Sequence, residues 1–257
     1  MILNDINYHG LDANLQYMSV SQFKDFMTCS NMAMAKIRGE YVVEPTKPML
    51  IGSFVDAYFG GELAQFTDAN PQVYTNKGTL RAEFVQAESI IARIKQDKLF
   101  MNYLSGDKQV MMTGELFGID WKIKMDSYIK GKAIVDLKII ASIRSLFWDD
   151  SVGQKVSFID KYGYDKQMAI YQKIVEINGG NRLPCFLAVA DKGTVTDLEI
   201  IHIPNDKLDF SLAEIEQNIN RIVSIKTGQI DADRCGLCDY CKATKVLTKP
   251  ISYVELI

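Results

Sequence analysis

Three charged residues interrupt stretches that otherwise have the pattern of buried β-sheet. Asp126 lies in the alternating run IDWKIKMDSYI, and Asp136 and Lys138 lie inside the apolar run AIVDLKII. Charged side chains are rarely buried unless they are paired or bound to something. Side chains two apart on a strand share a face, so Asp136 and Lys138 should point the same way. Pairing across the KGK turn would bring Asp126 close to them.

This group of residues predicts metal-assisted phosphate chemistry. Two carboxylates and the backbone carbonyl of Leu137 are hard oxygen donors, which suit Mg²⁺ or Mn²⁺ better than zinc. The ammonium of Lys138 could orient a water nucleophile or stabilise charge developing on a phosphate. The alternative is a salt bridge on an exposed strand face, and the spacing alone leaves both interpretations open.

The elements that must position these residues follow from the hydrophobic period. Helices are expected over 18–41 and 49–61, and over 79–104 as one long helix or two short ones. Three strands follow, over 109–118, 119–129 and 132–140, and their short links favour an antiparallel meander.

The second half alternates between helical and strand periods. A helix is expected over 162–180, strands over 183–192 and 198–204, and a last helix over 211–228, with Ser211 and Glu214 spaced as a capping box. We expect one α/β domain spanning residues 1–257. It would comprise a helical N-terminal part (1–105), a catalytic core (106–205), and a C-terminal helix with a cysteine-bearing tail (206–257).

Bulk properties exclude some classes of protein. No apolar run approaches the length of a membrane span, and the N-terminal residues lack the pattern of a signal peptide, so the cytoplasm is the expected compartment. The net charge of −3 argues against a protein that coats nucleic acid. It is compatible with an enzyme that has a basic groove and an acidic metal site.

The pattern of Asp126 followed ten residues later by Asp136-x-Lys138 resembles the PD-(D/E)xK nuclease superfamily. In YGYDKQMAIYQ, Gln167 and Tyr171 are similar to the Gln-xxx-Tyr motif of its RecB-like branch. GSFVDAYF resembles the Gly-xxx-His helix of that branch, with Asp56 where histidine is usual. With SQFKDFMTCSNMA, GELFGIDWKIKMD and RCGLCDYCKATKVL, these segments follow the order of phage and prophage RecE-like (exonuclease VIII-like) nucleases, over residues 17–250.

This resemblance implies a restriction-endonuclease-like core, with a central mixed sheet flanked by helices, and a role for each matching residue. Asp126, Asp136 and the Leu137 carbonyl would bind the metal, and Lys138 would be the catalytic lysine. Asp56 would lie near the metal, as a direct ligand or at a second site.

Four further residues each have two possible roles under the same resemblance. Glu115 matches an acidic position of the first strand, with structural and catalytic roles equally open. Gln167 and Tyr171 would line the DNA path, or be ordinary helix surface and core. Lys192 is a phosphate contact or a solvated loop lysine.

The implied activity is that of a Mg²⁺-dependent exodeoxyribonuclease. Such an enzyme would digest linear double-stranded DNA from the 5′ end in the cytoplasm of a bacterial host cell. The remaining 3′ strand would pass to a single-strand annealing protein, and the enzyme would form a ring-like homo-oligomer. The alternatives are a structure-specific or single-strand nuclease of the same fold, and a non-catalytic DNA-binding protein.

Cysteines suggest a second metal site. Cys235, Cys238 and Cys241 form CGLCDYC, a spacing similar to ferredoxin-type ligation, and Cys29 is the candidate for a fourth ligand. Soft thiolates favour a [4Fe–4S] cluster or zinc. RecB-like relatives such as AddB hold a [4Fe–4S] cluster with one early and three late cysteines. Free thiols packed in a turn are the alternative, and Cys185 is expected to be a buried core thiol.

Overall fold

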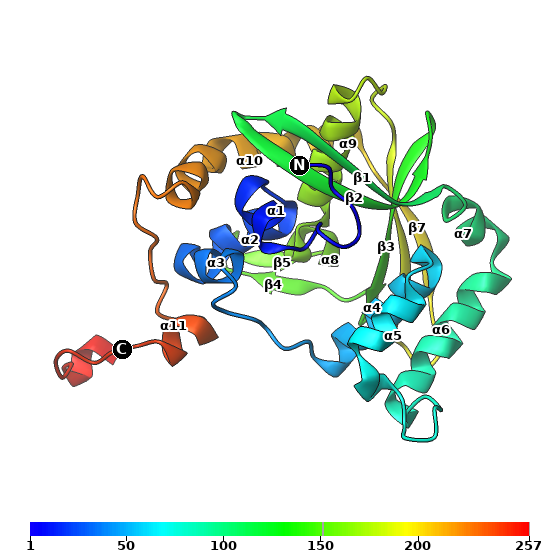
Figure 1. Cartoon of the computed structure of the whole chain (residues 1–257), viewed down its shortest axis with the longest axis horizontal. Helices are drawn as coiled ribbons and strands as arrows, with labels where there is room; N and C mark the ends of the chain where they lie inside the picture. Colours follow the sequence, from blue (N-terminus) through cyan, green and yellow to red (C-terminus); the bar gives the residue numbers. More distant parts are fainter. Residues whose placement is uncertain (151, 257) are drawn as a thin grey trace.

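A five-stranded mixed sheet forms the centre of the protein. The computed structural model describes residues 1–150 and 152–256 and is drawn in Figure 1. The strands are β1 (Asp107–Leu116), β2 (Ile119–Ile129), β3 (Ala133–Ile140), β6 (Cys185–Asp191) and β7 (Leu198–Ile203), in the spatial order β1-β2-β3-β6-β7. β3 and β6 are parallel, and the other neighbours are antiparallel. The antiparallel meander and the mixed sheet are therefore confirmed.

Helices cover both faces of the sheet. The longer elements are α2 (Val20–Thr28), α3 (Ser30–Ile37), α4 (Lys47–Gly60), α6 (Val85–Gln96), α9 (Tyr164–Ile177) and α10 (Asn205–Lys226). The shorter ones are α1 (Leu11–Gln16), α5 (Leu63–Ala69), α7 (Lys98–Tyr103), α8 (Phe158–Tyr162), α11 (Asp239–Ala243) and the 3₁₀ turns Pro71–Val73, Ala82–Phe84 and Tyr253–Leu256. Figure 1 shows α4 and α6 on one side of the sheet and α2, α3, α9 and α10 on the other.

Strand periodicity divides the core into two hydrophobic clusters. On β3, Ile134 packs with the cluster under α9 and α10, whereas Val135 and Leu137 pack with the cluster under α4 and α6. Alternate residues of a strand face opposite sides, so this division follows directly from the apolar run. It also places Asp136 and Lys138 on the face covered by α9.

The helix predicted over 18–41 is two helices. Ser19 caps α2, because its side chain accepts a hydrogen bond from Gln22 N. Cys29 then adopts an extended conformation (φ −167°, ψ 110°) that ends α2 and caps α3. Its thiol donates to the backbone carbonyl of Asp233, 204 residues away, and local periodicity cannot reveal such a partner.

The last long helix begins earlier than the capping-box pattern predicts. α10 starts at Asn205, and Ser211 lies inside it, fully buried. The Ser211 hydroxyl donates to Asp165 Oδ2 at 2.8 Å. The expected cap at Ser211 was wrong, because this hydroxyl joins α10 to α9 rather than closing a helix end.

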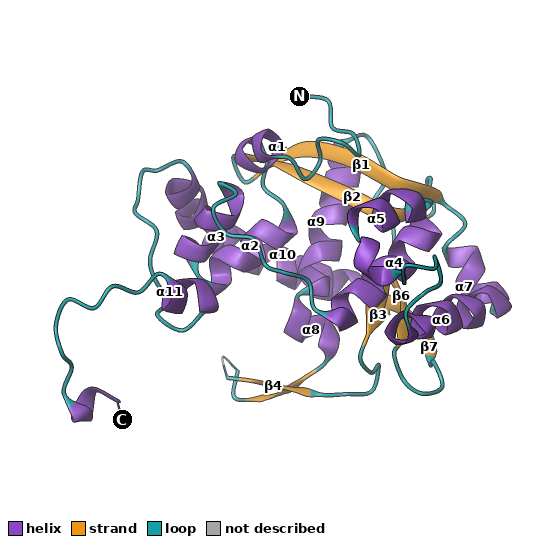
Figure 2. Ribbon diagram, turned by 60° about the horizontal axis from the view of Figure 1, so that its bottom comes forward, coloured by secondary structure: helices purple, strands orange, loops and turns teal. Residues whose placement is uncertain are grey.

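Two segments stand apart from the sheet. A small hairpin of β4 (Phe147–Asp149) and β5 (Gln154–Val156) leads into α8, and Figure 2 shows it below the sheet layer. The C-terminal segment runs away from α11 as an extended chain. Among the described residues, no helix is long and apolar enough to cross a membrane.

Candidate active site and cysteine cluster

The two acidic residues lie where β2 and β3 separate. The ladder between these strands pairs Ser127 with Val135, and the same register, extended by one residue, sets Asp126 opposite Asp136. At this point a side chain replaces the backbone as the hydrogen-bond acceptor between the strands. The backbone N–H of Leu137 donates to Asp126 Oδ2 at 2.8 Å. In an extended strand the N–H and C=O of one residue point to the same side. The carbonyl of Leu137 therefore also faces the gap between the strands.

Asp136 and Lys138 form a buried ion pair on β3. Asp136 is 1% exposed, and its Oδ2 lies 2.5 Å from Lys138 Nζ. Burial lowers the pKa of Lys138, but the carboxylates of Asp136 and Asp126 outweigh burial and raise it overall. The two carboxylates therefore favour the charged form of Lys138.

Two residues of α9 hold Asp136 in place. Gln167 Nε2 donates to Asp136 Oδ1 at 2.8 Å and lies 3.0 Å from Tyr171 Oη. Tyr171 Oη donates to the carbonyl of Lys124 at 2.9 Å, and its ring is buried. In this structure the Gln-xxx-Tyr pair orients the acid on β3 and ties α9 to β2.

The acids repel one another in a poorly solvated space. Burial raises the pKa of Asp126 well above its ordinary value, and the neighbouring Asp136 and Asp56 raise it further. Burial, the larger cause, and the nearby carboxylates of Asp136 and Glu62 raise the pKa of Asp56 to about 6. A bound cation would relieve this repulsion.

These residues fit a hard divalent cation. Asp136 Oδ2 has no hydrogen-bond donor with acceptable geometry despite being buried, and its contact with Lys138 is an ion pair. Mg²⁺ is commonly held by one or two carboxylates and several waters, which Asp126, Asp136 and the Leu137 carbonyl could provide. Among the described residues, Asp56, Asp126 and Asp136 do not form a group of three side chains that could hold one ion as they stand, whereas the four cysteines described below do.

The remaining predicted residues lie at different distances from this group. Asp56, on α4, is partly buried and close enough for its pKa to depend on Lys138 and Asp136. Glu115 is exposed near the β1–β2 turn, opposite Asp120 and therefore about 20 Å along β2 from Asp126. It is not part of the group. Lys192 follows β6 and donates through Nζ to the carbonyl of Pro48 at 3.0 Å.

Sequence patterns missed several residues around the site. Lys138 Nζ lies 4.8 Å from the ring centre of Tyr164, and Lys24 Nζ lies 5.7 Å from the same ring. Lys124 pairs with Glu62 at 2.9 Å beside Asp56. Tyr164 could have been found, since it precedes Gln167 by nearly one helical turn. The contact with Lys24, on a helix 140 residues earlier, has no signal in the sequence.

The four predicted cysteines come together at the other end of the protein. The sulfurs of Cys29, Cys235, Cys238 and Cys241 all lie within 4.8 Å of one another, with 3.6 Å between Cys29 and Cys241. A single tetrahedral ion with Zn–S bonds of about 2.3 Å sets its sulfurs about 3.8 Å apart. A [4Fe–4S] cluster places irons between its ligands and needs a wider arrangement. The spacing therefore fits one ion.

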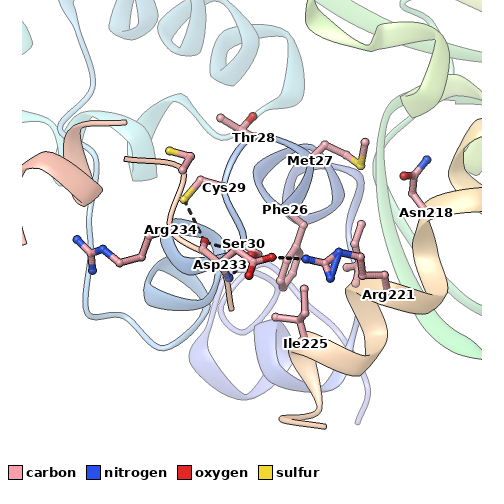
Figure 3. A pocket seen from close by; sticks show the side chains of 12 residues that line it. Phe26, Met27, Thr28, Cys29, Ser30, Asn218, Arg221, Ile225, Asp233 and Arg234 are labelled. Atoms are coloured by element: carbon pink, nitrogen blue, oxygen red, sulfur yellow. Dashed lines mark hydrogen bonds and ion pairs between the residues drawn. The ribbon is translucent and has the colours of Figure 1, made fainter. Parts of the chain in front are cut away.

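Backbone N–H groups donate to two of the four sulfurs, those of Cys235 and Cys238. The N–H groups of Cys238 and Leu237 donate to Cys235 Sγ and lower the pKa of this thiol to about 6. Figure 3 shows the neighbouring contact, in which Cys29 and Ser30 face the carbonyl of Asp233. Cys185 lies elsewhere, fully buried in β6, where burial raises the pKa of its thiol to about 12.

Comparison with known proteins agrees with this architecture. The sequence matches the family described as a PDDEXK-like domain of unknown function (DUF3799) over residues 19–244. A solved structure from Eubacterium rectale, described as "Putative exonuclease", is 49% identical, covers 100% of this chain and 98% of that chain, and has a TM-score of 0.96. Another, SSO0001, is 12% identical over 73% of this chain and 83% of that chain, with a TM-score of 0.27, which carries no argument. No curated protein matches the chain.

The family match spans most of the chain and includes every residue of the group on β2, β3 and α9. The mixed sheet, with its acids at the point where β2 and β3 part, has the architecture that this family description names. The chain therefore belongs to the PDDEXK-like DUF3799 family and has the PD-(D/E)xK nuclease fold.

Proposed function

We propose that this protein is a metal-dependent exodeoxyribonuclease. The observation that carries the proposal is the buried Asp136–Lys138 pair, with Asp126 opposite and Gln167 fixing the acid. A largely buried lysine beside two carboxylates is unusual for a purely structural ion pair, because burying charges is costly. The 49% identical structure described as "Putative exonuclease" supports the same class of reaction.

Each residue then has a definite task. Asp126, Asp136 and the Leu137 carbonyl would hold Mg²⁺ or Mn²⁺, which when bound supplies charge to the phosphate and lowers the pKa of a water ligand. Lys138 places a permanent positive charge beside the same phosphate, where it stabilises the negative charge of the transition state. Gln167 keeps the Asp136 carboxylate oriented, and Tyr171 fixes Gln167.

The finer features of the proposal come from the resemblance to RecE-like nucleases. We expect digestion of linear duplex DNA from the 5′ end, release of a 3′ single strand to an annealing protein, and a ring-like homo-oligomer. The chain's net charge of −3 does not oppose this, because a channel can be locally basic while the subunit is acidic overall.

The deciding experiment compares DNA forms. The protein is incubated with linear duplex, closed circular duplex and single-stranded DNA in the presence of Mg²⁺, with Lys138→Gln as the matched inactive variant. Loss of the linear duplex alone, abolished in Lys138→Gln, supports the exonuclease. Cleaved circles or preferential loss of single strands support the other nucleases of this fold, and binding without cleavage supports a DNA-binding protein. Blocking either end of the linear DNA then gives the polarity.

We further propose that the four cysteines hold one tetrahedral ion, zinc by preference, as a structural clamp. The proposal prefers zinc to the [4Fe–4S] alternative because the sulfurs lie within 4.8 Å of one another, close enough for a single ion. The clamp joins the α2–α3 junction at Cys29 to the C-terminal tail at Cys241. Its ion is expected to take no part in the phosphate chemistry.

A further inference from the structure

A row of aromatic rings leads away from the candidate active site. Tyr164, whose ring faces Lys138, lies 5.8 Å from the ring of Tyr162, and Tyr162 lies 5.4 Å from the ring of Phe147 on β4. Tyr164 and Phe147 are partly buried against the main hydrophobic cluster. Tyr162 is the open member of the row, with 43% of its surface exposed.

The chain is bent at one residue to make this row. Gly163 ends α8 in the left-handed conformation (φ 61°, ψ 41°) and precedes the first residue of α9. This turn sets Tyr162 and Tyr164, one on each helix, with their rings side by side. A side chain at Gly163 would be strained there and would also meet Lys24 Cδ at 3.1 Å.

Lysines border the row. Lys24 Nζ donates to the carbonyl of Tyr162 at 3.0 Å, and Lys161 Nζ donates to the carbonyl of Trp148 at 3.1 Å. Within residues 1–150 and 152–256, neither ammonium lies in an ion pair with a carboxylate. Both ammonium groups donate to neutral backbone carbonyls, so no adjacent carboxylate among the described residues neutralises them, although burial and the nearby Lys138 lower the pKa of Lys24. Cations that flank exposed aromatic rings are the usual composition of a single-strand nucleic-acid path.

We propose that Tyr162 is a stacking platform for an unpaired base at a DNA end, with Lys24 binding the adjoining phosphate. This inference rests on the proposed nuclease function and names how its site receives the strand. One cation-to-ring step of 4.8 Å and one ring-to-ring step of 5.8 Å separate Lys138 from Tyr162, a reach of at most about three stacked nucleotides. A base on Tyr162 would thus hold the strand close to the phosphate to be cleaved.

The same hairpin provides a matched control. Trp148 is 56% exposed and lies next to Phe147 on β4, but adjacent strand residues face opposite sides. Trp148 lies opposite Lys155 on β5 and Phe147 lies opposite Val156, so only Phe147 belongs to the face that meets Tyr162. Trp148 is therefore an exposed aromatic residue outside the row, with a larger exposed fraction than Tyr162.

The test uses a duplex with a short single-stranded extension that carries 2-aminopurine, whose fluorescence falls when it stacks on an aromatic ring. Binding to the full-length protein is measured with Ca²⁺ replacing Mg²⁺ to slow hydrolysis. We expect Tyr162→Ala to bind about 5- to 100-fold more weakly and to lose the quenching. Tyr162→Phe, which keeps the ring, and Trp148→Ala should retain both. Lys24→Gln should weaken binding and reduce its salt dependence by about one phosphate contact.

Three outcomes would overturn the inference. Tyr162→Ala could bind and quench as the wild type does, or Trp148→Ala could weaken binding as much. Tyr162→Ala could also change the sedimentation of the protein alone while leaving DNA binding intact, which would assign the ring to contact with a second copy of the chain.

Cleavage of linear duplex by the wild type is measured in parallel. If the wild type cleaves DNA, only the platform has failed, whereas a wild type that neither binds nor cleaves removes the nuclease function as well.

Discussion

The sheet site and the cysteine cluster are both candidate metal sites, but they are held together differently. The sheet site draws its acids from adjacent strands, and backbone and side-chain donors hold them, as Leu137 N does for Asp126 and Gln167 does for Asp136. The cluster joins Cys29 to Cys241, 212 residues apart, and two of its short contacts are between the sulfurs themselves. The first geometry is built into the fold, whereas the second depends on what the sulfurs bind.

This difference predicts opposite consequences of losing the ion. The strands and α9 should keep the sheet site in shape without a metal, so its loss would stop chemistry and spare the fold. Without an ion, the four thiols have only weak hydrogen bonds to one another and to nearby backbone groups, so the tail should loosen while the sheet site stays intact. Changes at each site can break or sharpen this contrast.

The largest expected effect is on catalysis, from Asp136→Asn. The amide keeps an oxygen for Gln167 but removes a negative charge that a cation and Lys138 both need. We expect nuclease activity to fall by at least about 100-fold. The protein should still unfold cooperatively, because the Asp126 carboxylate remains near Lys138. Initial rates on end-labelled duplex and thermal unfolding measure the two effects.

Asp12→Asn is a control for this change, because Asp12 is an exposed acid of α1. It removes the same charge far along the chain from β3 and should leave the rate within about twofold of the wild type. A wild-type rate in Asp136→Asn would show that the buried pair on β3 is structural. An Asp136→Asn variant that fails to fold would show that the sheet site, like the cysteine cluster, is needed for stability.

The next effect is on stability, from Cys29→Ser. Loss of one of four thiolates should release the ion, lower the melting temperature by roughly 5–10 °C, and leave the rate at lower temperature nearly unchanged. Elemental analysis should find one zinc per chain in the wild type and little in the variant. Cys185→Ala is the matched control, because Cys185 is a buried cysteine of β6 outside the cluster.

Two results would contradict the zinc clamp. A brown wild-type protein that absorbs in the visible would indicate a [4Fe–4S] cluster despite the sulfur spacing. A metal-free wild type in which Cys29→Ser and Cys185→Ala melt alike would indicate ordinary packed thiols.

Sequence reasoning worked where the backbone sets the geometry. The period-two pattern placed Asp136 and Lys138 on one face and Leu137 on the other, and the i, i+4 spacing brought Gln167 and Tyr171 into contact. These relations follow from strand and helix geometry over a few residues. The same reasoning gave the meander, because short turns leave little choice of topology.

It failed where distant side chains decide the local structure. Periodicity continued a helix through Cys29, but the contacts of this residue with Asp233 and Cys241 require an extended conformation. Ser211 has the spacing of a cap, yet its partner is Asp165 on another helix. The β4–β5 hairpin and the contact of Lys24 with Tyr162 were not predicted, because they are short or non-local.

A smaller effect is expected from Asp56→Ala, which tests how far the sheet site extends. Asp56 lies on α4, and its pKa is raised by burial and by Asp136, so it is electrostatically linked to the site. If it helps to hold a second cation, activity should fall roughly tenfold and require more Mg²⁺ for half-maximal rate. A Mg²⁺ titration of the variant measures this. An unchanged titration midpoint with a lower rate would place Asp56 outside the metal's ligands.

The smallest predicted effect concerns Lys226, a partly buried lysine that has, in the described part of the chain, no carboxylate partner of the kind that Asp136 provides for Lys138. Lys226 Nζ donates to the carbonyl of Tyr17 and to Gln22 Oε1, which are neutral, and burial lowers its pKa to about 7. The folded protein therefore binds fewer protons than the unfolded chain between about pH 7 and the ordinary lysine value, so stability should rise with pH in this window. We expect a gain of about 2 kcal/mol from pH 7 to pH 8.5, measured by urea unfolding. Lys226→Met should reduce this gain, and the parts due to Lys122, whose pKa is lowered to about 8, and to Cys235, whose pKa is lowered to about 6, should remain. Lys130→Met, at an exposed lysine in the β2–β3 turn, removes the same charge and should keep the full gain.

Equal pH dependence in Lys226→Met and the wild type would mean that Lys226 is solvated as an ordinary lysine. Neutral oxygens would then be sufficient to keep Lys226 charged. The need for carboxylate partners would apply to Lys138 in the sheet site alone.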